Sequence, residues 1–391
     1  MIFKILVGLC MVRAPSLFLV ASMSQSSSRY AHIDSLRAIA ALLVVWMHTS
    51  EVFVKVAAPG ISNSLFGMAH TLDFGRIGVV AFFAVSGFVI PSSLSGDRLS
   101  GSLSFAIKRF FRLYPLYWLS IPFGLLTTWY LWGKEVSLQT ILWNLTMVQE
   151  AAGFVSIQGL YWTLQTELVF YGLCVLLFLS GGLRSPLVLA ALVFVCHATF
   201  LMPQVMGFLG LPAPFELSPV MNFLLLHLGI MFWGALYRCW HDLEKGSLFL
   251  AVLVFGFALG WLSLAGLVVA YDRMIEPNEG LFRLYVPYGL GIFGFLVLAQ
   301  WVRLRGRLLV WLGTISYSIY LFHPVVMYPL LWLVKHDASG LLRGWPLWLY
   351  MVMTLPGIVA VSALTYRWVE QPAMRLGSRL ARKPAVTLSP A

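Results

Sequence analysis

The sequence predicts an all-α, polytopic transmembrane helical bundle with about ten spans. Hydrophobic residues make up 60% of the chain and charged residues only 10%, and the mean hydropathy is +0.86. The apolar residues also fall into repeated runs close to the roughly 20 residues that a helix needs to cross a bilayer. A soluble domain does not have this pattern, so we expect an integral protein of the lipid bilayer.

In chain order, the apolar runs predict spans at 34–54, 77–95, 113–132, 160–180, 185–203, 219–238, 248–270, 284–301, 307–334 and 345–369. The ninth run is too long for a simple span, and we expect Pro324 and Pro329 to kink or break it. Residues 100–112 are typical of an amphipathic helix at the membrane interface. Residues 138–150 are apolar but short, so we expect them to re-enter the membrane or to lie on its surface.

Residues 1–22 form a weakly apolar leader before the predicted transmembrane domain of residues 23–375. The leader suits a signal-like segment, an extra helix, or translation from too early a start codon, and Met23 favours the last interpretation. Placing alternate loops in the cytoplasm puts most Lys and Arg residues on the side of both core termini. We therefore expect a multi-pass protein of the inner (cytoplasmic) membrane, with residues 376–391 as a cytoplasmic tail.

The net charge of +11 could suggest a nucleic-acid partner, but the basic residues stand at the ends of apolar runs, where membrane topology requires them. We therefore expect no nucleic-acid binding. The four cysteines have neither paired spacing nor a histidine ligand pattern, so the sequence predicts neither a disulfide framework nor a metal site. A phosphate-binding loop and a dinucleotide-binding glycine motif are also absent from the sequence.

The stretch IDSLRAIAALLVVWMHTSE, residues 33–51, places Arg37 and His48 in an otherwise apolar helix. Their spacing returns the two side chains to within about 20° of the same helix face, roughly 16 Å apart along the axis. Because ionisable groups in a membrane normally face the protein interior or a water-filled cavity, the pair indicates a functional site. The alternative is structural, with Arg37 marking the cytoplasmic helix end and His48 capping the far end.

Five further stretches accompany this pattern: FFAVSGF at 82–88, RFFRLYPLYW at 109–118, YWTLQTELVFY at 161–171, SYSIYLFHP at 316–324 and YRWVEQP at 366–372. In this order they resemble the acyltransferase-3 family of multi-pass membrane O-acyltransferases, and the resemblance covers nearly the whole chain. It implies transfer of an acyl group to a hydroxyl. Such a reaction needs a base and oxyanion donors, and histidine is suited to the first task at neutral pH.

Glu167 stands within an apolar run, so we expect it to pair with a cation or a hydroxyl. It matches the glutamate of a motif in the resembled family, and it could orient His48 or Arg37, hold substrate hydroxyls, or form a structural pair between helices. His48 is the leading base, acting on the acceptor hydroxyl directly or carrying the acyl group transiently. Arg37, His48 and Glu167 are therefore the predicted catalytic residues.

Lys108, Arg109 and Arg112 precede an aromatic span on the predicted cytoplasmic side. Guanidinium groups bind phosphates well, and coenzyme A is cytoplasmic and carries phosphates, so these residues are the candidate site for an acyl-CoA donor. The alternative is that they only set the topology beside lipid headgroups. Acyl-CoA, most simply acetyl-CoA, is thus the expected cosubstrate.

Small or polar residues in the other motifs are candidates for the lining of a substrate cavity. These are Ser86, Ser316, Tyr320 and His323. His323 is either a second base or a histidine bonded to a backbone carbonyl near Pro324. We expect His197 and His227 to be satisfied structural residues, and Glu370 to pair with a loop arginine.

The sequence thus predicts a membrane acyltransferase that moves an acyl group, most simply acetyl, from cytoplasmic acyl-CoA to a hydroxyl of a carbohydrate or glycolipid. Surface polysaccharide, lipid-linked oligosaccharide and signalling oligosaccharide are all suitable acceptors. One alternative is acylation of a small secondary metabolite such as a macrolide sugar. Another is a proton-coupled transporter or flippase, in which Arg37, His48 and Glu167 form a relay.

Overall fold

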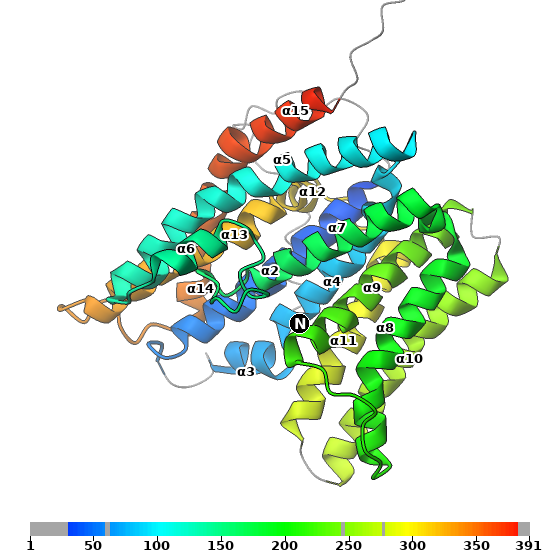
Figure 1. The fold of residues 1–391 in the computed structure, drawn as a ribbon. Coiled ribbons are helices and arrows are strands. Elements are labelled where there is room, and N and C mark those ends of the chain that lie inside the picture. The colour runs from blue at the N-terminus through cyan, green and yellow to red at the C-terminus, as the bar shows by residue number, and fades with distance from the viewer. Residues whose placement is uncertain (1–29, 59–62, 244–246, 276–277, 382–391) are drawn as a thin grey trace, which may run out of the picture.

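The computed structural model describes residues 30–58, 63–243, 247–275 and 278–381, and their regular structure is helical throughout (Figure 1). The predicted leader and the end of the predicted tail lie outside these residues. The helices are α2 (Ala31–Phe53), α3 (Asn63–Thr71), α4 (Phe74–Val89), α5 (Arg98–Gly124), α6 (Leu138–Asn144), α7 (Trp162–Ser180), α8 (Pro186–Phe208), α9 (Pro219–Asp242), α10 (Leu248–Met274), α11 (Glu279–Val297), α12 (Arg307–Thr314), α13 (Ser316–His336), α14 (Leu347–Thr365) and α15 (Gln371–Leu380).

Nine helices within the described residues are long and apolar enough to span a membrane, which confirms the all-α multi-pass bundle. The difference from the predicted set lies in α5. This helix joins the predicted interfacial piece at 100–112 and the predicted span at 113–132 into one rod. It continues through a π-helical turn, Leu125–Trp129, and a 3₁₀ turn, Tyr130–Trp132. The two segments are therefore not separate elements.

The predicted run 307–334 divides into α12 and α13 at Ile315, whereas α13 continues through Pro324 and Pro329. Of the predicted kink or break at the prolines, the break was therefore wrong. Pro324 lacks the N–H that would otherwise bond to the carbonyl of Tyr320 four residues earlier. The Nδ1 atom of His323 lies 2.9 Å from that carbonyl oxygen and takes its place. Because a side chain satisfies the freed carbonyl, the helix continues through Pro324.

Helix α2 lies at the centre of the fold, packed against α4, α12, α13 and α14. Two glycines allow backbones to approach it closely. A Cβ atom on Gly78 of α4 would lie 2.5 Å from the Ala40 carbonyl oxygen, and one on Gly313 of α12 would clash with the Asp34 carbonyl oxygen. Such small residues promote tight helix packing in membranes, where no hydrophobic effect drives helices together. The glycines thus fix the position of the helix that carries Arg37 and His48.

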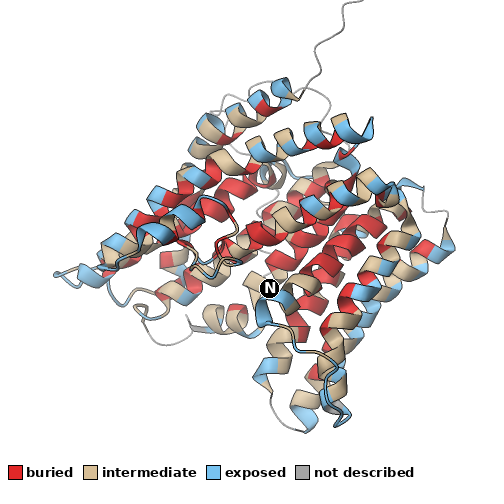
Figure 2. Cartoon of the chain, in the orientation of Figure 1, coloured by how far each residue is buried: buried red, intermediate tan, exposed pale blue. Residues whose placement is uncertain are grey.

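Buried residues concentrate in the central helices, whereas α8 and α10 form an outer layer (Figures 1 and 2). Several helices begin with a serine cap. Ser185 of the outer helix α8 and Ser218 of the inner helix α9 accept a bond from the backbone N–H three residues later and are followed by proline at the first helical position. Exposed apolar side chains such as Phe194 and Leu267 then face outward, as a lipid-facing surface requires.

Candidate active site

A small cavity of about 60 Å³ lies between the central helices α2, α4, α7 and α13. Its apolar wall comes mainly from α4, and its polar groups come from all four helices. The lining residues are Arg37, Val79, Phe82, Phe83, Ser86, Thr163, Leu164, Glu167, Ser316, Tyr317 and Tyr320. The structure therefore brings together five of the predicted site residues: Arg37, Ser86, Glu167, Ser316 and Tyr320.

Arg37 contributes a guanidinium group to this cavity from α2. It forms no ion pair with any carboxylate of the described chain, and its buried Nε has no hydrogen-bond partner there. The Oγ atom of Ser316, in the same lining, is also buried and unpartnered within the described residues. Buried polar atoms are almost always hydrogen-bonded in proteins. These two groups are therefore free to bind a polar ligand in the cavity.

Glu167 is held by hydroxyl groups, as the sequence predicted. Its Oε1 accepts a bond of 2.5 Å from the Tyr171 hydroxyl, one helical turn further along α7. The same oxygen accepts a bond of 3.2 Å from Ser86 on α4. The Arg109 guanidinium lies 5.5 Å from the centroid of the Tyr171 ring. Tyr171 thus connects the cavity carboxylate with a basic residue of α5.

His323 lies beside the cavity and has a defined tautomer. Its Nδ1 is 2.9 Å from the Tyr320 carbonyl oxygen and 3.3 Å from that of Ile319. A carbonyl only accepts hydrogen bonds, so Nδ1 carries the proton and Nε2 of the neutral ring has a free lone pair. Nε2 is buried and has no partner among the described residues. The bond to a backbone carbonyl and the capacity to act as a base therefore coexist in one side chain.

His48 also lies outside the cavity lining, next to His323. The centroids of the two imidazole rings are 5.2 Å apart, and the rings are tilted by 55°. The ring centroid of His323 lies in turn 6.3 Å from that of Tyr320, whose hydroxyl bonds to Thr163 at 2.9 Å. Polar side chains therefore follow one another from the cavity through Tyr320 and His323 to His48.

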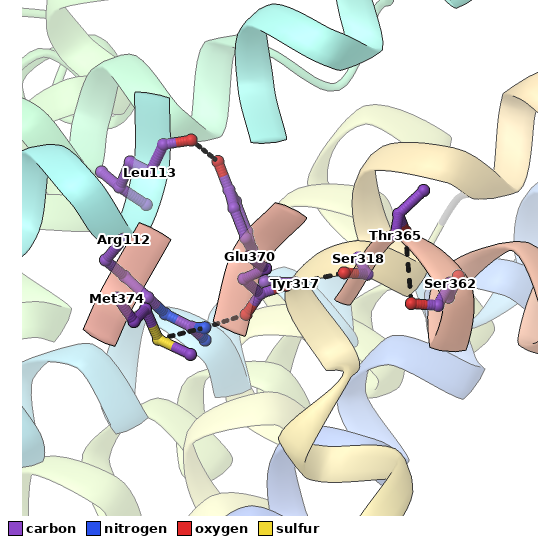
Figure 3. A network of polar contacts seen from close by, with 8 residues as sticks. All are labelled: Arg112, Leu113, Tyr317, Ser318, Ser362, Thr365, Glu370 and Met374. Atoms are coloured by element: carbon purple, nitrogen blue, oxygen red, sulfur yellow. Dashed lines mark hydrogen bonds and ion pairs between the residues drawn. The ribbon is translucent and has the colours of Figure 1, made fainter. Parts of the chain in front are cut away.

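A buried ion pair joins Arg112 of α5 to Glu370, at the end of the π-helical turn Tyr366–Glu370 (Figure 3). The Glu370 side chain is fully buried, and that of Arg112 is 16% exposed. Ser318 donates a bond of 2.6 Å to the other oxygen of Glu370, and the Arg112 guanidinium lies 5.5 Å from the Tyr317 ring centroid. Burial lowers the pKa of Arg112 to about 10, so this guanidinium stays charged at neutral pH.

Glu370 therefore has an arginine partner, but the arginine stands in the middle of a helix. The predicted loop partner was wrong because the helix α15 that follows Glu370 packs against α5. Gly377 of α15 rests directly on the Phe111 side chain. This packing brings the Glu370 carboxylate to Arg112. A contact between helices so far apart in the sequence leaves no local signal.

The other two basic candidates differ in their surroundings. Lys108 is exposed, whereas Arg109 is half-buried and donates a bond of 3.0 Å from Nη2 to the Ser93 hydroxyl. His227 is a satisfied structural residue, as expected, because its Nε2 lies 2.6 Å from the Tyr288 hydroxyl. His197 is satisfied only in part: its Nδ1 lies 2.8 Å from the Val193 carbonyl oxygen, and its buried Nε2 has no partner among the described residues. No group of metal-ligating side chains occurs in the portion of the chain that the structure describes.

Sequence reasoning missed Thr163, Tyr171 and Tyr317. Tyr171 could have been found, because it follows Glu167 by four residues and so shares its helix face. Thr163 and Tyr317 had no such signal. Tyr317 lines the cavity and donates a bond of 2.9 Å to the Leu113 carbonyl oxygen of α5, a contact that only the tertiary structure creates (Figure 3).

The fold and the cavity define a polytopic membrane protein with a polar site enclosed by its central helices. Comparison with known families identifies the class: the pattern of the family described as "Acyltransferase domain" matches residues 30–367. The chain therefore belongs to this family of membrane acyltransferases. It is also 29% identical over 393 residues to Nodulation protein 10 of Rhizobium leguminosarum bv. viciae, covering 93% of this chain and 98% of the relative. No solved structure gives a significant match.

Proposed function

We propose that this chain transfers an acetyl group from cytoplasmic acetyl-CoA to a hydroxyl of a carbohydrate or glycolipid. The main support is the set of unpartnered polar atoms at and beside one cavity: Arg37 Nε, Ser316 Oγ and His323 Nε2, judged within the described residues. A donor or acceptor that reaches this region would complete their hydrogen bonding. Membership of the acyltransferase family supports the reaction class.

In the proposed reaction, the acceptor oxygen attacks the thioester carbonyl carbon while His48 takes the hydroxyl proton. A C–O bond forms, the C–S bond breaks, and the proton passes to the departing thiolate. In the alternative route, the His48 imidazole attacks the thioester carbonyl first, the C–S bond breaks, and the CoA thiolate leaves with the imidazole proton. The acceptor hydroxyl then attacks the acetyl-imidazole, the C–N bond breaks, and the hydroxyl proton passes to the imidazole. In both routes His323 Nε2, next to the His48 ring, can accept a hydrogen bond from the hydroxyl or from the His48 ring.

Arg37 and His48 would act on different parts of the substrates. Their side chains start from one helix face roughly 16 Å apart along the axis, which is too far for both to contact one thioester. Arg37 would therefore bind oxygens of the pantetheine arm of the acyl-CoA donor, in the cavity that Arg37 and Glu167 both line. Glu167, already bonded to Ser86 and Tyr171, would orient cavity groups or bind a substrate hydroxyl.

Lys108 and Arg109 are the proposed contacts for donor phosphates, with Arg112 beside them. Lys108 is exposed, and Arg109 retains a buried Nε without a partner among the described residues. Arg112 forms an ion pair with Glu370, so its hydrogen bonds are not available to the donor. In this scheme Arg112 contributes only positive electrostatic potential to the binding of the donor phosphates. This arrangement assumes that the end of the bundle carrying α5 Arg98 faces the cytoplasm, as the distribution of basic residues predicts.

The proposed acceptor class rests on membership of the family and on the place of His48 in α2. His48 lies near the end of α2 away from Arg37 and from the proposed cytoplasmic side. The relative in Rhizobium leguminosarum bears a name that refers to nodulation, so a signalling oligosaccharide belongs among the acceptors to be tested. Surface polysaccharide and lipid-linked oligosaccharide are the other candidates. A small secondary metabolite remains the alternative acceptor within the same chemistry.

The test is release of the CoA thiol from acetyl-CoA by the protein in nanodiscs, with and without a glycan extract. We expect release that the glycan stimulates, that His48→Ala abolishes, and that His336→Ala leaves intact, because His336 is exposed at the far end of α13. Absence of release with every donor and acceptor, together with proton-coupled uptake of a solute that depends on His48, would replace this proposal with a transporter.

A further inference from the structure

A second concave site lies on the surface of α15 and involves none of the residues discussed above for catalysis. It is an open groove of about 410 Å³. Its lining consists of Tyr366, Gln371, Met374, Arg375, Ser378 and Arg379. Arg375 and Arg379 are exposed and form no ion pair within the described residues. Two free guanidinium groups one helical turn apart, with a serine between them, are suited to a phosphate monoester dianion.

The groove adjoins the network beside the cavity. Met374 lines the groove, and its sulfur accepts a bond of 3.2 Å from Nη1 of Arg112 (Figure 3). The Arg112 guanidinium in turn lies 5.5 Å from the ring of Tyr317, which lines the cavity. A ligand with a phosphate in the groove would therefore have its other end close to the cavity wall.

We propose that this groove binds the ribose phosphate monoester at the nucleotide end of the CoA donor. The proposal rests on the proposed acetyl-CoA function and extends it by a separate anion site. The long pantetheine arm of the donor would run past Met374 and Arg112 towards Tyr317 and Arg37. Arg375 and Arg379 would then hold the outermost phosphate, and Ser378 would donate a further hydrogen bond.

The position of Arg375 on α15 favours a soluble phosphate over a lipid headgroup. Its exposed apolar side chains, Leu376 and Leu380, indicate the side that faces lipid. On a helical wheel Arg375 lies about 100° from Leu376 and about 140° from Leu380, whereas Arg379 lies about 60° and about 100° from the same two residues. Arg375 is therefore well separated from the apolar side of the helix, and Arg379 lies at its edge. The helix is held in this rotation by the contact of Gly377 with Phe111 of α5.

The experiment measures the affinity of the full-length protein in nanodiscs for CoA and for 3′-dephospho-CoA, which lacks only the ribose phosphate. We expect the wild type to bind CoA about tenfold more tightly, since charge-assisted hydrogen bonds typically contribute at least this factor. Arg375→Ala/Arg379→Ala should remove the preference without changing the affinity for 3′-dephospho-CoA. Arg367→Ala removes one exposed charge nearby, outside the groove, and should keep the preference.

Nanodiscs of neutral lipid, and of neutral lipid with phosphatidylglycerol, separate the two phosphate sources. The proposal is supported if the wild type prefers CoA equally in both kinds of nanodisc and if Arg375→Lys/Arg379→Lys, unlike the alanine variant, keeps this preference. Equal affinity for the two nucleotides, or an effect of the alanine variant that appears only with anionic lipid, overturns it. If the protein transfers acetyl groups but binds CoA and 3′-dephospho-CoA equally, the groove proposal is refuted and the proposed function is not. If it prefers CoA through Arg375 and Arg379 but transfers no acetyl group, the proposed function is refuted and the groove proposal is not.

Discussion

Removal of the Glu370 carboxylate should destabilise the protein strongly. Glu370→Ala leaves Arg112 charged and largely buried and deprives Ser318 of its acceptor. Breaking a buried ion pair in this way costs about 3–5 kcal/mol. For a chain of 391 residues, an unfolding entropy of about 2.1 cal/mol/K per residue converts this loss into a decrease in Tm of about 4–6 °C. Thermal unfolding in detergent, followed by tryptophan fluorescence, measures the decrease.

The double variant Arg112→Met/Glu370→Met separates stability from donor binding. Replacement of a buried ion pair by apolar residues is often neutral or stabilising, so the double variant should recover most of the lost Tm. If Arg112 also contributes potential to donor binding, the recovered protein should still show a raised KM for acetyl-CoA. A wild-type Tm for Glu370→Ala, or a double variant as unstable as the single one, would refute the reasoning.

Three further predictions concern the packing and the site. Gly87→Ala adds a Cβ that clashes with the Met231 carbonyl oxygen of α9, so it should lower stability by about 1–3 kcal/mol. Gly172→Ala meets open space and should not. Thermal unfolding compares the two variants, and equal Tm values would contradict the close helix contact. Glu167→Ala should lower kcat/KM for acetyl transfer by about 100-fold through misplaced cavity groups, and activity within a factor of about two of wild type would exclude that role. His323→Ala should lower kcat by about 100-fold while His336→Ala does not, and equal kcat values for the two variants would remove His323 from the reaction.

The sequence carried most of the information about the spans, because the length of an apolar run and the bilayer thickness are physically linked. It failed where tertiary contacts decide. The prolines of α13 looked like helix breakers, yet the His323 side chain satisfies the carbonyl that Pro324 frees. Helix α5 appeared as two elements because its charged half and its apolar half differ in composition, although the backbone is continuous.

The candidate site was predictable in its residues more than in its arrangement. Helical periodicity placed Arg37 and His48 on one face, and the cost of an isolated charge in a membrane singled out Glu167. The partners of these residues come from other helices. The proximity of His48 to His323 depends on how α2 packs against α13, a contact between helices far apart in the sequence.

The most direct test of the proposed function follows an isotope from donor to acceptor in a single turnover. Acetyl-CoA labelled in the acetyl carbonyl is mixed with excess protein in nanodiscs and the glycan acceptor, and the glycan fraction is then counted. We predict that the label appears in the glycan as a base-labile ester with the wild type, and that His48→Ala binds acetyl-CoA with unchanged affinity but transfers no label. Labelled glycan at the wild-type rate with His48→Ala would contradict the central role assigned to this histidine.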